Sequence, residues 1–348
     1  MRIKSFLFGL FFMVASNALH AKNGLTVEID HRMEALSIFY TLATADTFDI
    51  KPTPSTYYKD LQEYFAPFKD HRSLNWYRNL KSWDGYDIAS LGLFLSDRHP
   101  LKVKVQPEGH YIVSSPVDTF LYHFNNFYKE CKVGEFIRRH GDLYRSICES
   151  AKGTIDTSGI LGDIQAFYGK TSPGEFAVYL DLLNNMGNNA IPSDSKKFKG
   201  KRMFRLAYLN DKAKSLTNDD AVAFTPQLNI ITQEISHLFL QSFIPSYRQE
   251  LFTIRNLFLT TSKGETLKES QWENEADELI VRVCTAKILE QKFGKEKGSK
   301  EIENQSRHFR LAKPMYAFFD TYTSNRNEFK TFADFYPNLL RYLEGYNE

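Results

Sequence analysis

The fold is decided by the stretch Leu228-Asn229-Ile230-Ile231-Thr232-Gln233-Glu234-Ile235-Ser236-His237-Leu238-Phe239-Leu240. Its isoleucines and leucines recur at helical spacing, which predicts a helix buried along much of its surface. Three polar residues interrupt it: Gln233, Glu234 and His237. Burying a glutamate is unfavourable unless it is paired or linked to a metal. We therefore expect the Glu234 carboxylate to be paired with another side chain or bound to a metal ion.

The spacing of these three residues resembles a zinc-binding motif. In His-Glu-x-x-His, two histidines one turn apart bind zinc, and the glutamate between them activates a metal-bound water. Here Gln233 stands in place of the first histidine. A second Glu-x-x-His, at Glu28 and His31, shows that the spacing alone is not specific. A core helix whose polar residues satisfy one another remains the alternative interpretation.

Composition places the chain among globular proteins and gives no sign of nucleic-acid binding. The 348 residues are 42% hydrophobic and carry a net charge of only +2. This length is ample for a large core. The lysine-rich segments 196–201 and 292–300 are short and are interpreted as solvated loops.

The first residues have the pattern of a secretory signal peptide. Arg2 and Lys4 precede an apolar run at 6–15, and cleavage is expected after Ala18 or Ala21. No later segment has the roughly 18 consecutive apolar residues of a membrane span. We therefore expect an exported protein, periplasmic or secreted, with no membrane span.

The three cysteines are expected to be free and mostly buried. A bond between Cys131 and Cys148 is excluded if residues 133–147 form one helix, because bonded cysteines have Cα atoms within about 7 Å. Only a break near Gly141 would allow that bond. Cys284 is the third cysteine.

The order of predicted elements indicates an α+β protein that is predominantly helical. Residues 22–168 are expected to form a helical N-terminal half, with one long stretch that ends at Gly153. Residues 169–345 are expected to add a small sheet and the helix at 228–240, which gives one domain at 22–345. The predicted strands are 25–29, a hairpin at 101–106 and 110–113, then 176–183, 203–209 and 221–224. Polar connections are expected at 184–189 and 193–201.

A later helix, predicted at 269–293, supplies acidic candidates for the same site. Glu278 lies directly before the apolar residues 279–281, and Arg282 is its i+4 neighbour. In zinc sites a later helix often provides the third ligand. Glu278 is the first candidate and Glu275 is the second. An ordinary ion pair between Glu278 and Arg282 is the alternative.

Taken in order, several segments resemble an uncharacterised family of exported bacterial proteins with features of gluzincin metallopeptidases. The segments that carry the resemblance are 27–38, 64–71, 124–128, Phe136, His140 and Tyr144, 167–169, 234–237 and 278–282. The resemblance implies a mixed fold with a zincin-like core, made of a small sheet and a pair of site helices. Typical members have a histidine where this chain has Gln233.

The resemblance implies roles for four residues. Glu234 would be the general base, and His237 and Glu278 would bind zinc, with Gln233 as a weak third ligand. We therefore expect a metallopeptidase-like protein that is degenerate or weakly active, with a peptide or protein as substrate or partner. The alternative is a non-catalytic module that binds a peptide or protein in the old cleft. Zinc content would distinguish these two hypotheses.

Overall fold

The computed structural model describes residues 24–44, 51–80, 85–106, 116–169, 175–191, 198, 201–209 and 215–346. The expected signal peptide at 1–21 lies outside these residues. Within them, the chain is mostly helical and contains one small mixed sheet, so the predicted α+β class is confirmed.

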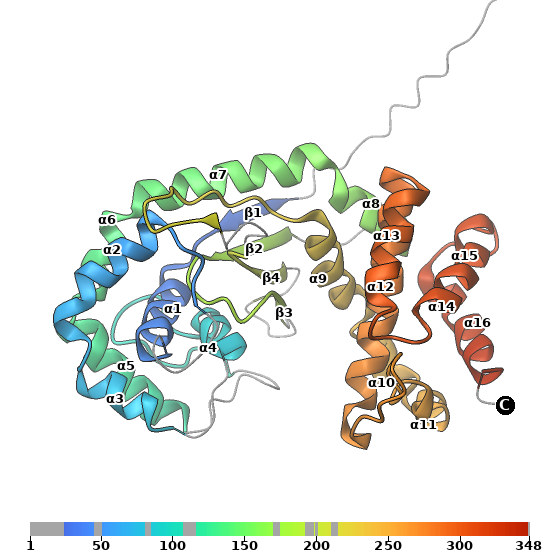
Figure 1. Ribbon diagram of the computed structural model, residues 1–348, viewed down its shortest axis with the longest axis horizontal. Coiled ribbons are helices and arrows are strands. Elements are labelled where there is room, and N and C mark those ends of the chain that lie inside the picture. Colours follow the sequence, from blue (N-terminus) through green and yellow to red (C-terminus); the bar gives the residue numbers. More distant parts are fainter. Residues whose placement is uncertain are drawn as a thin grey trace, which may run out of the picture.

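The sheet has four described strands in the order β1-β2-β4-β3 (Figure 1). The strands β1 (Leu25–Glu28), β2 (Glu175–Asp181) and β4 (Lys201–Ala207) are parallel, whereas β3 (Asn189–Ile191) runs antiparallel to β4 at one edge. The side chains of β2 and β4 are buried almost throughout, as is typical of parallel strands covered on both faces.

Most helices of the first half curve around one end of the sheet (Figure 1). The helix α7 (Gly141–Ser158) extends alongside β1, and α1 (His31–Thr44) lies against the sheet (Figure 1). Asp30 accepts hydrogen bonds from the first backbone N–H groups of α1, as expected for a cap. The other helices of this half are α2 (Thr56–Phe65), α3 (Arg72–Arg78), α4 (Gly85–Leu91), α5 (Val117–Glu130), α6 (Val133–Arg139) and α8 (Ile160–Tyr168).

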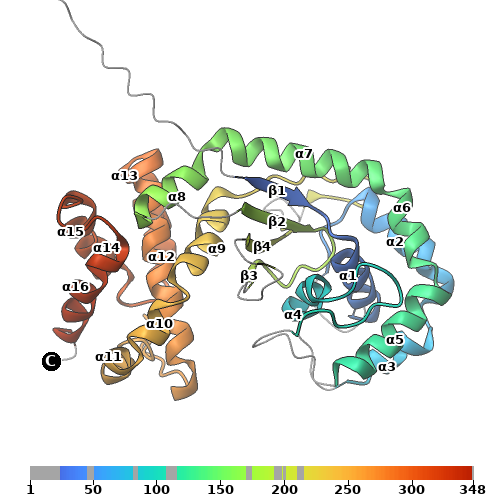
Figure 2. The same cartoon turned by 180° about the vertical axis from the view of Figure 1, so that it is seen from behind.

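Helices of the second half lie beyond the other end of the sheet. The helix α9 (Leu228–Leu240) contains the opening stretch and packs between the sheet and α12 (Trp272–Phe293), as both views show (Figures 1 and 2). The remaining helices are α10 (Phe243–Ser246), α11 (Arg248–Thr253), α13 (Lys295–Gln305), α14 (Ala312–Phe318), α15 (Asp320–Ser324) and α16 (Phe332–Glu344). One large cluster of buried apolar side chains extends from Leu25 to Leu343.

Several sequence predictions about secondary structure are wrong. Residues 101–106 form no strand, and the second strand of that predicted hairpin, 110–113, lies outside the described residues. Residues 221–224 form no strand, because this segment turns through Thr225-Pro226 into α9 without a neighbouring strand. The edge strand β3 (Asn189–Ile191) was not predicted, and it begins at the last residue of the predicted polar connection 184–189. The helix α7 continues through Gly153 to Ser158, because a single glycine weakens a helix by only about 1 kcal/mol and packing outweighs it.

Two further predictions concern the cysteines and the lysine-rich segment 292–300. The long helical stretch does break at His140 and Gly141, between α6 and α7, yet all three cysteines are free. Cys131 and Cys284 are buried and Cys148 is half-buried, as expected. The segment 292–300 is helical rather than a loop, since it contains the end of α12 and the start of α13. Among the described residues, no helix is both long enough and apolar enough to cross a membrane.

Candidate functional site

Contacts at the C-terminal end of α9 fix the position of this helix. Arg202 of β4 donates a hydrogen bond of 3.1 Å to the backbone oxygen of Leu238, and its guanidinium lies 4.3 Å from the ring centre of Phe239. A cation is favourable at this end of a helix, where backbone oxygens are unpaired. The ring of Phe239 also stacks on Tyr168 of α8, with ring centres 4.7 Å apart. The polar face of α9 is therefore held in a fixed orientation toward α12.

His237 of α9 contacts two adjacent carboxylates of α12. Its Nδ1 lies 2.7 Å from Oδ2 of Asp277, and its Nε2 lies 3.4 Å from Oε1 of Glu278. The second oxygen of Glu278 accepts from Arg282, with Nη2 at 2.9 Å. The side chains of His237, Asp277 and Glu278 are all largely buried. We call these four residues, His237, Asp277, Glu278 and Arg282, the His237 cluster.

The structure brings together most of the residues that the sequence suggested. His237 and Glu278 converge from separate helices, so the predicted convergence of these two residues is confirmed. The predicted i+4 pair between Glu278 and Arg282 is present as well. Glu275, the second candidate, binds His308 instead, with Oε2 and Nε2 3.0 Å apart. Of these two candidates, Glu278 is therefore the one that faces His237.

The charges in the His237 cluster stabilise one another. Burial disfavours charge on His237, but hydrogen bonds to Asp277 and Glu278 outweigh burial and raise the pKa of His237 to about 10. Burial likewise disfavours charge on Glu278, yet His237 and Arg282 lower its pKa to about 2. At neutral pH His237 is therefore positively charged and Glu278 is negatively charged.

Glu234 lies one turn before His237 on α9 and is only 4% exposed. Burial raises the pKa of Glu234 to about 7, although the nearby charge of His237 lowers it. A backbone hydrogen bond from Ala190 of β3 also lowers this pKa. Glu234 therefore lies between the edge strand and the His237 cluster, and it gains or loses a proton near neutral pH.

Sequence reasoning missed Asp277. The residue immediately precedes Glu278, so the two carboxylates lie about 100° apart around α12 and can approach one imidazole from two sides. An acidic pair placed directly before a buried apolar run was the available signal. A histidine that binds a metal almost always donates its other ring N–H to a carboxylate or carbonyl, and Asp277 occupies that position relative to His237.

The distance between His237 Nε2 and Glu278 Oε1 matches the separation of two ligands around a tetrahedral zinc ion. Two ligands that are each about 2.1 Å from a tetrahedral zinc lie roughly 3.4 Å apart, and the observed Nε2–Oε1 distance is 3.4 Å. This pair therefore fits two corners of a zinc site. Gln233, one turn before His237 and buried, offers only an amide for a third corner. Within the described ranges, no three His, Cys, Asp or Glu side chains form a metal-binding group.

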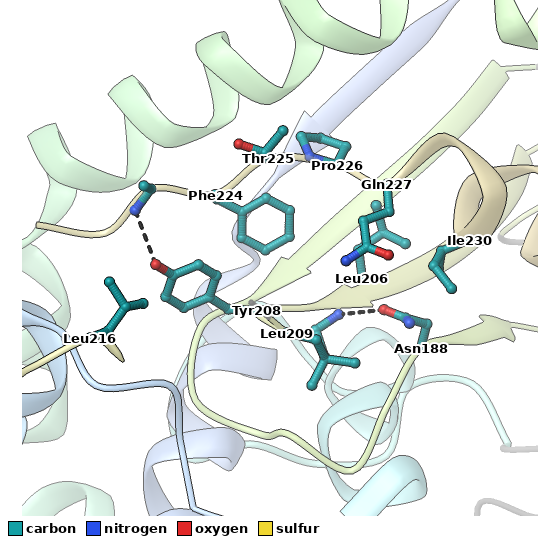
Figure 3. Close-up of a pocket in the computed structure, with 12 residues that line it drawn as sticks. Asn188, Leu206, Tyr208, Leu209, Leu216, Phe224, Thr225, Pro226, Gln227 and Ile230 are labelled. Carbon is teal, nitrogen blue, oxygen red and sulfur yellow. Dashed lines mark hydrogen bonds between the residues drawn. The ribbon is translucent and has the colours of Figure 1, made fainter. Parts of the chain in front are cut away.

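A cavity of about 570 Å³ lies beside the N-terminal end of α9 (Figure 3). We call it the α9–β4 cavity. Its polar wall groups are partly satisfied within the protein: the Tyr208 hydroxyl accepts from the backbone N–H of Ala223, and Asn188 Oδ1 accepts from that of Ala207. The described residues that line it are Asn188, Leu206, Ala207, Tyr208, Leu209, Leu216, Ala223, Phe224, Thr225, Pro226, Gln227 and Ile230.

Comparison with known proteins identifies one family. The profile of a family described as "Domain of unknown function (DUF4932)" matches residues 25–342, from β1 into α16. No curated protein matches the chain, and no solved structure matches it.

Proposed function

This chain belongs to the DUF4932 family, and we propose that it is a metallopeptidase-like protein of the gluzincin kind with weakened zinc binding and little hydrolytic activity. The observation that carries the proposal is the placement of His237 Nε2 and Glu278 Oε1 3.4 Å apart, with Asp277 on the opposite ring nitrogen. A small sheet with an antiparallel edge strand next to α9 supports a zincin-like core. Gln233 in place of a histidine explains why zinc binding would be weak.

Each residue has a distinct role in this proposal. His237 and Glu278 would hold zinc, and Asp277 would orient the imidazole through Nδ1. When bound, zinc would polarise a substrate carbonyl and make a bound water more acidic. Glu234 would accept a proton, because its pKa of about 7 suits a base that works near neutral pH.

Zinc titration tests the proposal. Wild type should bind zinc weakly and hydrolyse peptides slowly if at all, and Gln233→His should bind zinc more tightly by more than about 100-fold. First-shell ligands matter more than the outer partners, whose loss weakens binding about 10- to 100-fold. The double variant Gln233→His/His237→Ala is the control and should lose this gain. Equal zinc affinities for all three proteins would exclude a metal site at this position.

A second candidate function is a non-catalytic module that binds a peptide or protein. Both ring nitrogens of His237 already face carboxylates, so the His237 cluster is balanced in charge by its own residues. The neighbouring cavity of about 570 Å³ falls within the usual range for ligand sites, roughly 300–1,000 Å³. Peptide binding that persists in the presence of a strong chelator, together with zinc affinity that Gln233→His does not change, would favour this candidate.

Export is the third part of the proposal. The positive first residues and the short apolar run support removal of a signal peptide and an exported protein, periplasmic or secreted. Mass spectrometry of the exported protein should give a first residue of Lys22 or Leu19. A mature protein that retains Met1 would contradict this expectation.

A further inference from the structure

We propose that the α9–β4 cavity binds a bulky apolar side chain of a peptide whose backbone extends to Glu234 and His237. This inference rests on the proposed function and on its peptide-binding alternative, because it assigns the class of peptide that the proposed site would take. The helix α9 connects the cavity to Glu234 and to the His237 cluster, and β3 connects the cavity to Glu234.

The position of the cavity relative to Glu234 follows from these two elements. On α9, Ile230 lines the cavity and lies one turn before Glu234, which corresponds to about 6 Å along the helix axis. On the opposite wall, Asn188 lines the cavity and Ala190, two residues later, contacts Glu234. Two residues of extended chain span roughly 7 Å. An extended peptide that reaches Glu234 would therefore place a side chain in the cavity about two residues away.

The chemistry of the lining selects an apolar occupant. Among the described lining residues none is charged, and most are aliphatic or aromatic. Because Tyr208 and Asn188 already bond to backbone N–H groups, they have less capacity for a polar ligand. A buried charge in such a cavity would be unfavourable, whereas an apolar side chain gains by leaving water.

Two residues that line the cavity, both labelled in Figure 3, are exposed to solvent. Leu209 is 40% exposed although it is a large apolar residue, and Thr225 is also exposed. The edge strand β3 begins directly after Asn188, which lines the cavity, and it has no second strand partner among the described residues. Peptides commonly bind to such edges through their main chain. This combination favours a peptide over an isolated small apolar molecule.

The test uses three blocked pentapeptides: N-acetyl-Ala-Ala-Phe-Ala-Ala-amide and the versions with Ala or Asp at the central position. Binding to the full mature chain is measured by NMR titration with a chelator present, so that zinc plays no part. Wild type should bind the Phe peptide at least roughly tenfold more tightly than the Ala peptide, as expected for burial of a phenyl ring. The Asp peptide should bind no better than the Ala peptide.

Two variants change the cavity in different ways. Leu209→Asp places a charge at an exposed position of the cavity wall, and Thr225→Trp adds a bulky ring at another exposed position. Each variant should reduce binding of the Phe peptide to the level of the Ala peptide. Tyr122→Asp is the control, because Tyr122 is exposed on α5 and does not line the cavity. Thermal unfolding of each variant confirms that it is folded.

Several outcomes would overturn the inference: equal binding of the Phe and Ala peptides, no peptide binding, or a preference for Phe that both variants retain. Binding of decanoate to wild type, with no binding of any peptide, would assign the cavity to an acyl chain and overturn it too. None of these outcomes changes the zinc titration of Gln233→His. The two proposals can therefore fail separately.

Discussion

His237 and Asp277 are joined by a hydrogen bond of 2.7 Å between Nδ1 and Oδ2, and this bond links α9 to α12. A charged imidazole donates through both nitrogens, so its Nε2 is free to bind the second carboxylate, Glu278. One imidazolium therefore connects two acids of one helix to another helix. The positive charge of His237 therefore depends on Asp277 as well as on Glu278.

Asp277→Asn tests this dependence. The substitution removes a negative charge, so the pKa of His237 should fall below its value of about 10 in wild type. In the Gln233→His background, zinc affinity should fall about 10- to 100-fold. NMR titration of the His237 imidazole and zinc titration measure the two effects. Glu275→Gln is the matched control, because Glu275 is on the same helix but binds His308. An unchanged pKa in Asp277→Asn would contradict the expectation.

Glu34 of α1 should make the protein less stable at alkaline pH. The side chain is buried, accepts a hydrogen bond from the Tyr57 hydroxyl, and has one oxygen, Oε2, with no hydrogen-bond partner. Burial, assisted by the nearby charge of Asp181, raises the pKa of Glu34 from 4.5 to about 8. The folded protein thus retains a proton that the unfolded chain releases. Stability should therefore fall as pH rises from about 4.5 to 8.

Glu34→Gln removes this titration. Relative to wild type, the variant should gain about 4 kcal/mol in free energy of unfolding between pH 5 and pH 9. Urea denaturation at both pH values measures the difference. Glu296→Gln, on the exposed surface of α13, is the control and should show no such gain. A constant difference between Glu34→Gln and wild type across this range would mean that Glu34 titrates normally.

Arg205→Met should be among the most destabilising substitutions in the sheet. Arg205 is fully buried in β4 and binds Asp181 at 2.8 Å, Asn189 at 2.8 Å and the backbone oxygen of Gly187 at 2.7 Å. These bonds attach the segment before β3 to the centre of the sheet. Loss of the guanidinium leaves the Asp181 carboxylate buried without its cation, which should lower the free energy of unfolding by about 3–5 kcal/mol.

Denaturation of Arg205→Met and of the double variant Arg205→Met/Asp181→Asn provides the measurement. The double variant should recover part of the loss, because it no longer buries an unpaired charge. Strictly additive effects of the two substitutions would show that the ion pair is not the source of the destabilisation.

Gly169→Ala tests the contact between α8 and the C-terminal segment. Gly169 has φ +65°, and an added Cβ would lie 2.1 Å from the backbone oxygen of Lys330. Gly264 has a similar φ, +80°, but an added Cβ would meet nothing within 4 Å. Gly264→Ala should therefore lower the free energy of unfolding by only about 1–2 kcal/mol, the backbone penalty alone. Gly169→Ala should be clearly more destabilising in parallel urea denaturation, and equal losses would contradict the contact.

The α+β class, most helices and the convergence of His237 with Glu278 could be predicted from the sequence. Apolar spacing and capping residues are local signals, as for Asp30 before α1. The two site helices were predicted because each carries an acid inside an apolar run. The helices depend on residues that are neighbours in the chain, which is why they can be predicted from a single sequence. The convergence of His237 with Glu278 is not a local feature, and it was predicted from the arrangement of ligands in zinc sites.

The edge strand β3 and the role of Asp277 could not be predicted in the same way. The strand Asn189–Ile191 follows an asparagine-rich segment and is held by Arg205, which lies later in the chain. Residues 221–224 alternate like a strand but find no partner, and Phe224 instead lines the α9–β4 cavity. The conformation of β3 therefore depends on a residue that is distant in the sequence, and that of 221–224 depends on the absence of a neighbouring strand. Glu275, Asp277 and Glu278 look similar in sequence, and only the packing of α9 on α12 selects between them.

The parallel pairing of β1 with β2 has a consequence for the order of folding. Leu25 pairs with Phe176, so the first described strand has no partner until about half of the chain has been made. Closing such a long loop is unfavourable in entropy and slows the formation of the sheet. The helices of the first half can form early from local contacts, whereas the strand that precedes them in the chain must wait. Synthesis and folding therefore proceed in different orders, and a chain stopped before residue 175 would lack the partner of β1.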